Sequence, residues 1–202
     1  MIKGFYFITD GRLSTSGNIS DVKNAISVGV QVIQYRCTNE TDRQMFEECN
    51  IIKKLCKKKD VIFIINNRID IVFAVDADGV HLGQKDLPIF IARKILGKNK
   101  IIGISINSLK QANQAYKQGS DYIGIGPIFS TNTKPDAGKP VGINIISKIK
   151  KSISIPIVAI GGINIANAPY VIQAGSDALC AISEVLTKKN IKKEIEKFQS
   201  LF

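Results

Sequence analysis

Short apolar runs alternate with amphipathic segments along the whole of this 202-residue chain. The apolar runs are rich in isoleucine, valine and aromatic residues, and they predict strands at residues 5–9, 32–35, 61–65, 79–82, 100–105, 122–125, 157–160 and 178–183. Within each run the hydrophobicity is nearly continuous, which is typical of parallel strands that are covered on both faces. The pattern therefore predicts a parallel sheet buried under helices.

Helical segments with their own start signals separate these strands. Ser20, Thr41 and Ser108 are suited to N-caps and Pro88 to a first helical turn, because a side-chain oxygen or a missing N–H fits a helix start. The predicted helices occupy residues 21–28, 42–57, 88–96, 109–118, 145–150, 166–174 and 191–202. Strand and helix thus alternate from one end of the chain to the other.

Alternation of this kind has two main architectures, an open doubly wound sheet and a closed eight-stranded barrel. Eight repeats, without a Gly-x-Gly-x-x-Gly motif after the first strand, favour the barrel. No linker or low-complexity segment divides the chain. We therefore expect an α/β fold, a single TIM (β/α)8 barrel domain over residues 1–202, whose loops must be short at this length.

Composition narrows the partners and the compartment. The net charge is +11, from 28 Lys and Arg against 17 Asp and Glu, which attracts anionic substrates or nucleic acid. The lysine clusters at 53–59 and 188–193 lack interleaved aromatic residues, so we interpret them as solvated helix faces and expect no nucleic-acid partner. No apolar run approaches the ~18 residues of a membrane helix, and the N-terminal run is too short for a signal peptide. With four cysteines that lack Cys-x-x-Cys spacing, the composition is that of a cytoplasmic protein with reduced thiols and no membrane partner.

The segment 121–134 carries the strongest chemical signal. It reads Asp-Tyr-Ile-Gly-Ile-Gly-Pro-Ile-Phe-Ser-Thr-Asn-Thr-Lys, an apolar strand followed by glycines, where a ligand can approach the backbone, and then by a polar loop. Thr131, Thr133 and Lys134 offer two hydroxyls and an ammonium, a donor set suited to phosphate oxygens. A second strand-to-glycine junction, at 161–162, lies where barrels commonly bind phosphate. The two junctions indicate an enzyme that holds phosphorylated molecules.

The active face of a barrel collects residues at the carboxyl ends of its strands. The groups predicted there are Thr9, Asp10, Gln34, Arg36, Asn66, Asn67, Gln84, Asp86, Ser105, the 131–134 loop, Gly161, Gly162, Ile182 and Ser183. The early strands supply amides, a guanidinium and carboxylates, whereas the later ones supply hydroxyls, an ammonium and backbone N–H groups. This division suits two ligands, one beside a divalent cation and one held by its phosphate.

Several of these groups also have a purely structural interpretation. An inward-facing arginine such as Arg36 is as often half of a structural ion pair as a ligand clamp. Asn66, Asn67 and Asp86 could cap the helices that follow them. His81, the sole histidine, lies mid-strand between two apolar residues, and we expect it to be structural.

Together, the motifs resemble those of the thiamine-phosphate synthase family over essentially the whole chain. The resemblance rests on segments 7–10 (Phe-Ile-Thr-Asp), 34–36 (Gln-Tyr-Arg), 65–70 (Ile-Asn-Asn-Arg-Ile-Asp), 77–86 (Ala-Asp-Gly-Val-His-Leu-Gly-Gln-Lys-Asp), 103–105 (Gly-Ile-Ser), 121–134, 160–163 (Ile-Gly-Gly-Ile) and 174–177 (Ala-Gly-Ser-Asp). It implies a transferase that joins hydroxymethylpyrimidine diphosphate to a thiazole phosphate, giving thiamine phosphate and pyrophosphate.

The resemblance also implies roles for individual residues. It places the pyrimidine diphosphate at Gln34, Arg36, Thr38, Asn66, Ser105 and Lys134, of which Arg36, Ser105 and Lys134 are the catalytic candidates. It places the thiazole phosphate at Thr131, Thr133, Gly162, Ile182 and Ser183. It places Mg²⁺, the expected cofactor, at Asn67 and Asp86. Mg²⁺, Arg36 and Lys134 would together neutralise the departing pyrophosphate, so no side-chain nucleophile is required.

Two positions depart from the family pattern, which usually has lysine at the position of Thr38 and aspartate at that of Asn67. Each change removes a charge from the pyrophosphate and metal end, so Mg²⁺ affinity should fall. One alternative is therefore a non-catalytic, phosphate-ligand-binding barrel of the thiamine pathway. Another is a thiazole tautomerase-like isomerase, although that branch uses a histidine where this chain has Pro127. The expected partners are the two phosphorylated small-molecule substrates, and the sequence is compatible with a homo-oligomer.

Overall fold

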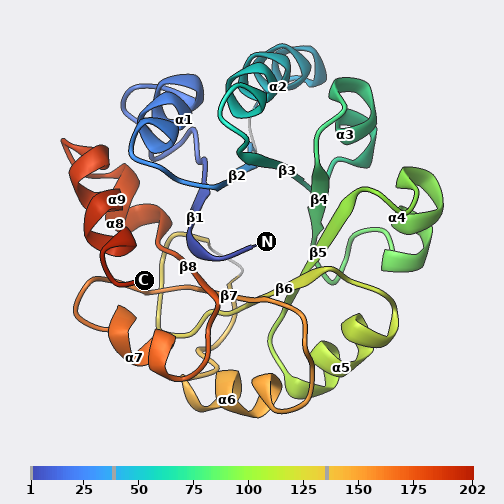
Figure 1. Ribbon diagram of the computed structural model, residues 1–202, viewed down its shortest axis with the longest axis vertical. Helices are drawn as coiled ribbons and strands as arrows, with labels where there is room; N and C mark the ends of the chain where they lie inside the picture. The colour runs from blue at the N-terminus through green and yellow to red at the C-terminus, as the bar shows by residue number, and fades with distance from the viewer. Residues whose placement is uncertain (1, 38–39, 135–136) are drawn as a thin grey trace.

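Eight parallel strands close into a barrel in the order in which they follow one another in the chain, so that β1 pairs with both β2 and β8 (Figure 1). The computed structural model describes residues 2–37, 40–134 and 137–202. The strands are β1 (Gly4–Ile8), β2 (Val32–Tyr35), β3 (Ile62–Asn66), β4 (Gly79–Leu82), β5 (Ile101–Ile106), β6 (Tyr122–Ile125), β7 (Ile157–Ile160) and β8 (Ala178–Cys180). The predicted TIM barrel is confirmed.

Helices form the outer ring of the barrel (Figure 1). They are α1 (Asn18–Ser27), α2 (Asp42–Lys57), α3 (Ile69–Val75), α4 (Ile89–Leu96), α5 (Leu109–Lys117), α6 (Asn144–Lys150), α7 (Ala168–Gln173), α8 (Ile182–Leu186) and α9 (Ile191–Gln199). Neither α3 nor α8 was among the helices predicted from the sequence pattern. The predicted strand 178–183 is wrong beyond Cys180, because α8 begins at Ile182.

Two of the predicted N-caps start helices. Thr41 accepts a hydrogen bond from the Gln44 N–H, and the Gln44 side chain accepts one from the Thr41 N–H, a capping box at the start of α2. Ser108 caps α5, because its side chain accepts a hydrogen bond from the Gln111 N–H. The Ser20 cap is wrong, because α1 already begins at Asn18 and Ser20 lies within its first turn.

Both faces of the strands are buried, which explains their continuous hydrophobicity. Along β1, Phe5 and Phe7 belong to the large core beneath the helices, whereas Tyr6 and Ile8 belong to a smaller core inside the barrel. The alternation arises because successive side chains of a strand point to opposite faces. The interior is not wholly apolar, since Gln34 is also buried, with 2% of its surface exposed.

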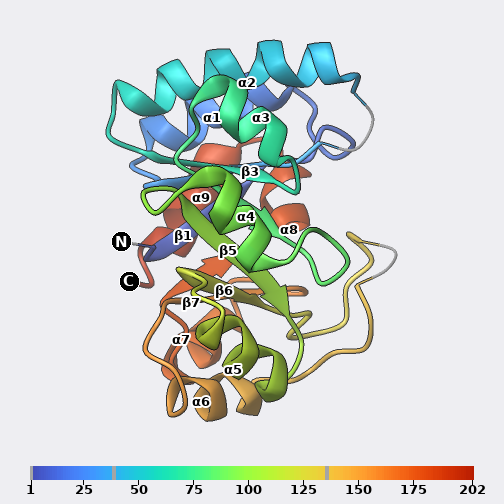
Figure 2. The ribbon, with the colours of Figure 1, turned by 90° about the vertical axis from the view of Figure 1, so that its right-hand side faces the viewer.

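The two ends of the barrel differ in what they carry. Figure 2 shows both chain termini at one end, while the loop after β6 projects from the other. Because all the strands run parallel, their carboxyl ends meet at this second end, called here the carboxyl end of the barrel. The topology therefore gathers the candidate site residues there from distant parts of the chain.

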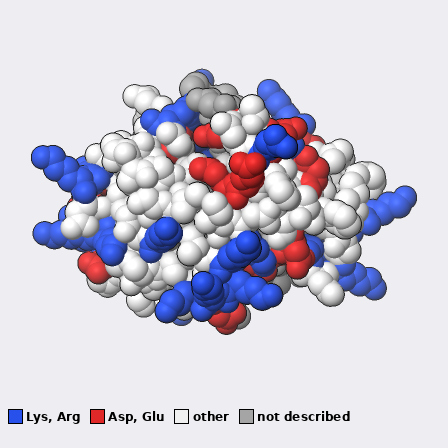
Figure 3. Space-filling model, turned by 90° about the horizontal axis from the view of Figure 1, so that it is seen from above, with Lys and Arg blue, Asp and Glu red and all other residues white. Residues whose placement is uncertain are grey.

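The outer surface carries scattered charge. In Figure 3, lysine and arginine side chains project at several separate places, with acidic side chains between them. All four cysteines are free, as predicted. Within the described ranges, no helix has both the length and the apolar character needed to cross a membrane.

Candidate active site

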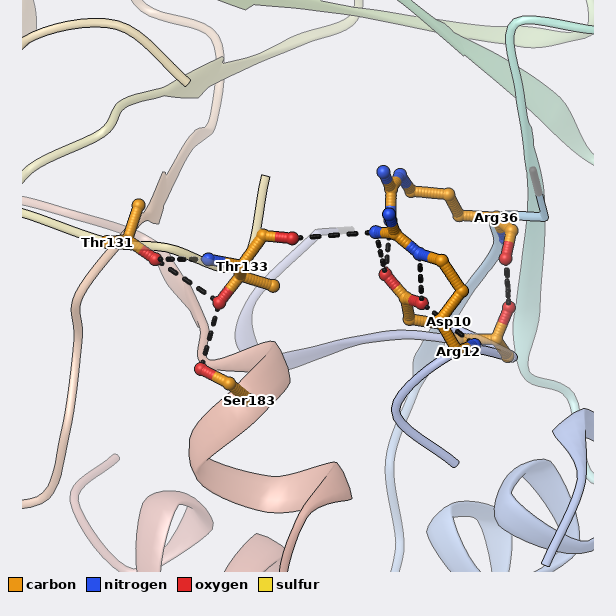
Figure 4. Close-up of polar contacts among 7 residues, drawn as sticks. Asp10, Arg12, Arg36, Thr131, Thr133 and Ser183 are labelled. Atoms are coloured by element: carbon orange, nitrogen blue, oxygen red, sulfur yellow. Dashed lines mark hydrogen bonds and ion pairs between the residues drawn. The ribbon is translucent and has the colours of Figure 1, made fainter. Parts of the chain in front are cut away.

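A cationic cluster lies at the carboxyl ends of β1 and β2 (Figure 4). Arg36 forms an ion pair with Asp10, and Arg12 donates to the same carboxylate from Nε at 3.2 Å and from Nη2 at 3.1 Å. Burial alone raises the pKa of Asp10, but the hydrogen bonds and charges of Arg12 and Arg36 more than reverse this, so its pKa lies below the ordinary value. One ionised carboxylate thus holds two guanidinium groups together.

Thr9 fixes the backbone beneath this cluster. Its hydroxyl donates to the Arg36 carbonyl oxygen at 3.1 Å and accepts from the Arg36 N–H at 2.9 Å. Arg36 is also half of the ion pair with Asp10, as its structural interpretation predicted. A guanidinium carries five N–H donors, so pairing with one carboxylate does not exhaust its capacity to bind an anion.

Arg12 was not among the residues predicted from the sequence. Its only local signal is its place two residues after Asp10, directly beyond the first strand. Its Nη2 also reaches the Thr133 carbonyl oxygen at 3.5 Å, across the carboxyl end of the barrel (Figure 4). A single charged side chain therefore connects the early-strand and late-strand halves of the site.

Three hydroxyls form a second cluster, contributed by the loop after β6 and by α8 (Figure 4). Thr131 Oγ1 donates to Thr133 Oγ1 at 3.2 Å, and Thr133 Oγ1 donates to Ser183 Oγ at 2.9 Å. Ile182, the first residue of α8, lies next to Ser183 and is half-buried. The residues predicted for the thiazole phosphate are thus brought together by the fold.

Two glycines complete this half of the site. Gly161 and Gly162 have φ values of 100° and 64°, a left-handed region that favours glycine. A Cβ at Gly162 would stand 2.5 Å from the Ser130 carbonyl oxygen, and one at Gly161 would stand 2.5 Å from Pro127 Cβ. The pair therefore lets the end of β7 pack directly against the start of the β6 loop.

A buried chain of hydrogen bonds crosses the barrel interior and ends at Ser105. Gln34 Nε2 donates to Tyr6 Oη at 2.9 Å, and the hydroxyls of Tyr6 and Tyr122 are 2.7 Å apart. Tyr122 Oη lies 2.8 Å from His81 Nδ1, and His81 Nε2 lies 2.9 Å from Ser105 Oγ. Two predicted site residues, Gln34 and Ser105, are therefore connected through the core.

His81 is buried, as expected of a structural residue, but its contact with Ser105 makes it part of the site as well. Burial lowers the pKa of His81 to about 4, and the positive charge of Lys134 acts in the same direction. The imidazole is therefore neutral near pH 7. The Lys134 charge thus acts on His81, the hydrogen-bond partner of Ser105.

The candidate metal ligands lie at the carboxyl ends of β3 and β4. Asn67 follows β3 with a φ of 63°, a left-handed conformation that Asn and Asp adopt more readily than most residues. Asp86 accepts a backbone N–H of its own loop at 2.6 Å. The capping interpretation is wrong for both, because the N-cap residues of α3 and α4 are Arg68 and Pro88.

The remaining candidates are placed as follows. Asn66 is the last residue of β3 and is half-buried, and Lys134 is exposed on the loop after β6. Thr38 lies outside the described residues.

At the carboxyl end of the barrel, cationic groups thus lie beside hydroxyls and glycine N–H groups. Cations favour departure of an anionic group, and neutral donors can hold a phosphate in place. The fold and the site together define a TIM-barrel enzyme that handles phosphorylated substrates.

Comparison with known proteins identifies the family. Residues 5–185 match the family model described as thiamine monophosphate synthase, so the chain belongs to that family, as its motifs had indicated. A Methanosarcina barkeri relative named thiamine-phosphate synthase is 48% identical over 194 residues, covering 96% of this chain and 88% of the relative. A Chloroflexus aurantiacus relative of the same name is 43% identical over 197 residues, covering 97% and 91%. The solved structure of thiamine phosphate pyrophosphorylase from Pyrococcus furiosus is 39% identical, with a TM-score of 0.91 over 98% of this chain and 94% of that one.

Proposed function

We propose that the protein condenses hydroxymethylpyrimidine diphosphate with thiazole phosphate, giving thiamine phosphate and pyrophosphate. Membership of the family supports this reaction. The observation that carries it to this chain is the pair of clusters at one end of the barrel, cationic and hydroxyl, with Arg12 in contact with both. The reaction needs this pairing, because one substrate must lose its diphosphate while the other keeps its phosphate.

The cationic half would support departure of pyrophosphate. The bond between the pyrimidine methylene carbon and a diphosphate oxygen breaks as negative charge develops on the leaving group. Arg36 and Lys134 are the cations proposed to stabilise that charge, with Gln34, Asn66 and Ser105 holding the rest of the pyrimidine diphosphate. The aminopyrimidine can stabilise positive charge on the methylene carbon, which the thiazole nitrogen then attacks. No protein nucleophile enters this sequence.

The hydroxyl half would hold the phosphate that stays on the thiazole. Thr131, Thr133 and Ser183 are uncharged donors, and Gly162 and Ile182 can add backbone N–H groups. A phosphate anchored there fixes the distance and direction of the thiazole nitrogen. Orientation of this kind lowers the barrier of a reaction between two bound molecules.

Mg²⁺ is the proposed cofactor of the cationic half, held by Asn67 and Asp86. Across the described residues, no cluster of three or more His, Cys, Asp or Glu could hold a metal. The donor set nevertheless fits Mg²⁺, which is usually held by one or two carboxylates together with water and substrate phosphates. When bound, it would add positive charge beside the diphosphate oxygens.

Incubation of the purified protein with both substrates and Mg²⁺ tests the proposal. We expect thiamine phosphate and pyrophosphate in equal amounts, and much less of both from Thr133→Val, which lacks the hydroxyl bonded to Ser183. Binding of the thiazole phosphate without any product would instead favour the non-catalytic barrel. The isomerase alternative gains no support from the structure, since Pro127 offers no acid or base at the position where that branch has histidine.

A further inference from the structure

In the buried hydrogen-bond chain, each of the three residues between Gln34 and Ser105 has one proton to donate. Tyr6 and Tyr122 are almost completely buried, and burial raises the pKa of both hydroxyls, so both keep their protons. Neutral His81 likewise carries one N–H. For all of these hydrogen bonds to form together, each of the three residues must therefore donate to one neighbour and accept from the other. The direction chosen at one end then determines every bond up to the other end.

Gln34 sets that direction. It turns its amide nitrogen toward Tyr6, and an amide nitrogen can only donate. Tyr6 must then donate to Tyr122, and Tyr122 to His81 Nδ1. This leaves the imidazole proton on Nε2, where it is donated to Ser105 Oγ. The Ser105 O–H is not used by the chain, and Ser105 is exposed at the end of β5.

The strands provide space for the rings of this chain. A Cβ at Gly103 would stand 2.1 Å from the Tyr122 ring, and a Cβ at Gly124 would stand 3.1 Å from His81 Cε1. Glycine weakens a strand interior, because it costs conformational entropy and packs no side chain. Here two neighbouring strands, β5 and β6, carry glycine where the aromatic rings lie. This is a second, steric observation that the chain is built into the barrel.

We propose that Tyr6, Tyr122 and His81 are positioning residues, a one-directional hydrogen-bond relay from Gln34 that makes the Ser105 hydroxyl a donor to the pyrimidine diphosphate. The identity of that ligand rests on the proposed function, whereas the direction of the relay does not. In the opposite direction Ser105 would donate to His81 and present only lone pairs, which repel diphosphate oxygens. The relay also couples the two ligand contacts, because a change at Gln34 is transmitted to Ser105.

The single histidine makes the direction measurable without any substrate. In protein labelled with ¹⁵N-histidine, all imidazole signals come from His81. We expect the proton to be bound to Nε2 and absent from Nδ1, shown by the one-bond ¹⁵N–¹H coupling. A proton on Nδ1 would overturn the proposal, whether or not the protein makes thiamine phosphate.

Tyr6→Phe tests whether the Gln34 end sets the direction. Without the Tyr6 hydroxyl, Tyr122 and His81 can bond in either direction, so we expect the imidazole proton to be shared between the two nitrogens. Tyr35→Phe is the matched control, because Tyr35 is equally buried but donates to Glu48 at 2.6 Å, outside the relay. An imidazole in Tyr6→Phe that stays fully protonated at Nε2 would contradict the coupling.

Kinetics test whether the relay acts through Ser105. Tyr122→Phe keeps the ring that fills the space beside Gly103 and should raise KM for the pyrimidine diphosphate about threefold to tenfold, the loss expected for one hydrogen bond. KM for the thiazole phosphate should not change. On a Ser105→Ala background the Tyr122→Phe effect should disappear, because the residue through which it acts is gone. An effect that persists undiminished on that background would reject the positioning role.

Discussion

At the scale of single residues, Asp10 determines how charge is arranged in the site. Its carboxylate is almost fully buried and holds both Arg12 and Arg36. Two cations held so close together repel each other, and a shared carboxylate offsets this repulsion while leaving the group a net positive charge. Asp10 thereby orients the Arg12 guanidinium, which also donates to the Thr133 carbonyl oxygen on the other half of the site.

Arg12→Ala should therefore impair the use of both substrates. We expect kcat/KM to fall by at least roughly tenfold for each, because a charge-assisted bond at the junction of the two halves is lost. Stability should change little, since the Arg12 side chain is partly exposed. Steady-state kinetics against both substrates checks this, with Arg43→Ala, an exposed arginine of α2, as the control. An effect confined to one substrate would contradict the bridging role.

The buried His81 should make stability depend on pH. Its pKa is about 4 in the folded protein, against an ordinary value of 6.5, so between these values the unfolded chain binds a proton that the folded chain does not. The free energy of unfolding therefore falls as pH drops from about 6.5 to about 4, by about 3 kcal/mol in total. Urea unfolding at several pH values checks this. His81→Asn, which cannot titrate, should lack this part of the decrease, and parallel curves for the two proteins would disprove the assignment.

Activity at the proposed Mg²⁺ site should depend on the charges of Asn67 and Asp86. Asp86→Asn should remove most Mg²⁺-dependent activity, because Asn67 is already neutral and no carboxylate of the proposed pair would remain. Asn67→Asp should have the opposite effect and lower the Mg²⁺ concentration needed for half-maximal activity, since aspartate also tolerates the φ of 63° found there. Asp76→Asn, at the exposed C-cap of α3, is the control for loss of a carboxylate. Unchanged Mg²⁺ titrations in both site variants would reject the metal assignment.

At the scale of elements, periodicity predicted the strands because both of their faces are buried. It failed at α3, where Ile-Asp-Ile-Val-Phe-Ala-Val has the β-branched content of a strand, and at α8, which follows β8 too closely to be separated from it. The glycine junctions were found because their pattern is local. The roles of Arg12 and His81 were missed because they depend on residues 121 and 24 positions away.

Gly162 shows how a single junction between elements supports the site. Gly162→Ala should destabilise the protein by about 3 kcal/mol, from left-handed strain and from the clash with the Ser130 carbonyl oxygen, and should weaken thiazole phosphate binding. Gly119→Ala is a matched control, because Gly119 has a φ of +81° in the left-handed turn that ends α5 and no atom lies within 4 Å of the added Cβ. It should cost only about 1 kcal/mol, the strain alone. Equal losses in chemical unfolding would show that the close packing at Gly162 is unimportant.

At the scale of the whole molecule, the barrel brings residues from distant parts of the chain together at its carboxyl end. Thr133 and Ser183 are 50 positions apart in the chain, yet they are hydrogen-bonded because every strand ends at the same rim. The net charge of +11 favours the approach of both anionic substrates. This charge is spread over helical faces, however, so the residues at the carboxyl end of the barrel determine how the substrates are oriented, and the overall charge does not.

Because the thiazole phosphate would contact the loop after β6, the end of β7 and α8 together, its binding should stabilise the whole fold. At a concentration of one hundred times Kd, linkage adds about 2.7 kcal/mol, which corresponds to a rise in Tm of roughly 5 to 10 °C for a chain of this length. Thr133→Val should lose most of this rise while unfolding at nearly the same temperature without ligand. Tyr35→Phe should retain it relative to its own unliganded Tm, because the Tyr35 hydroxyl donates to Glu48 of α2 and not to the hydroxyl cluster. A melting temperature that does not respond to the thiazole phosphate in the unmodified protein would show that the hydroxyl cluster binds something else, and the assignment of the two halves would have to be revised.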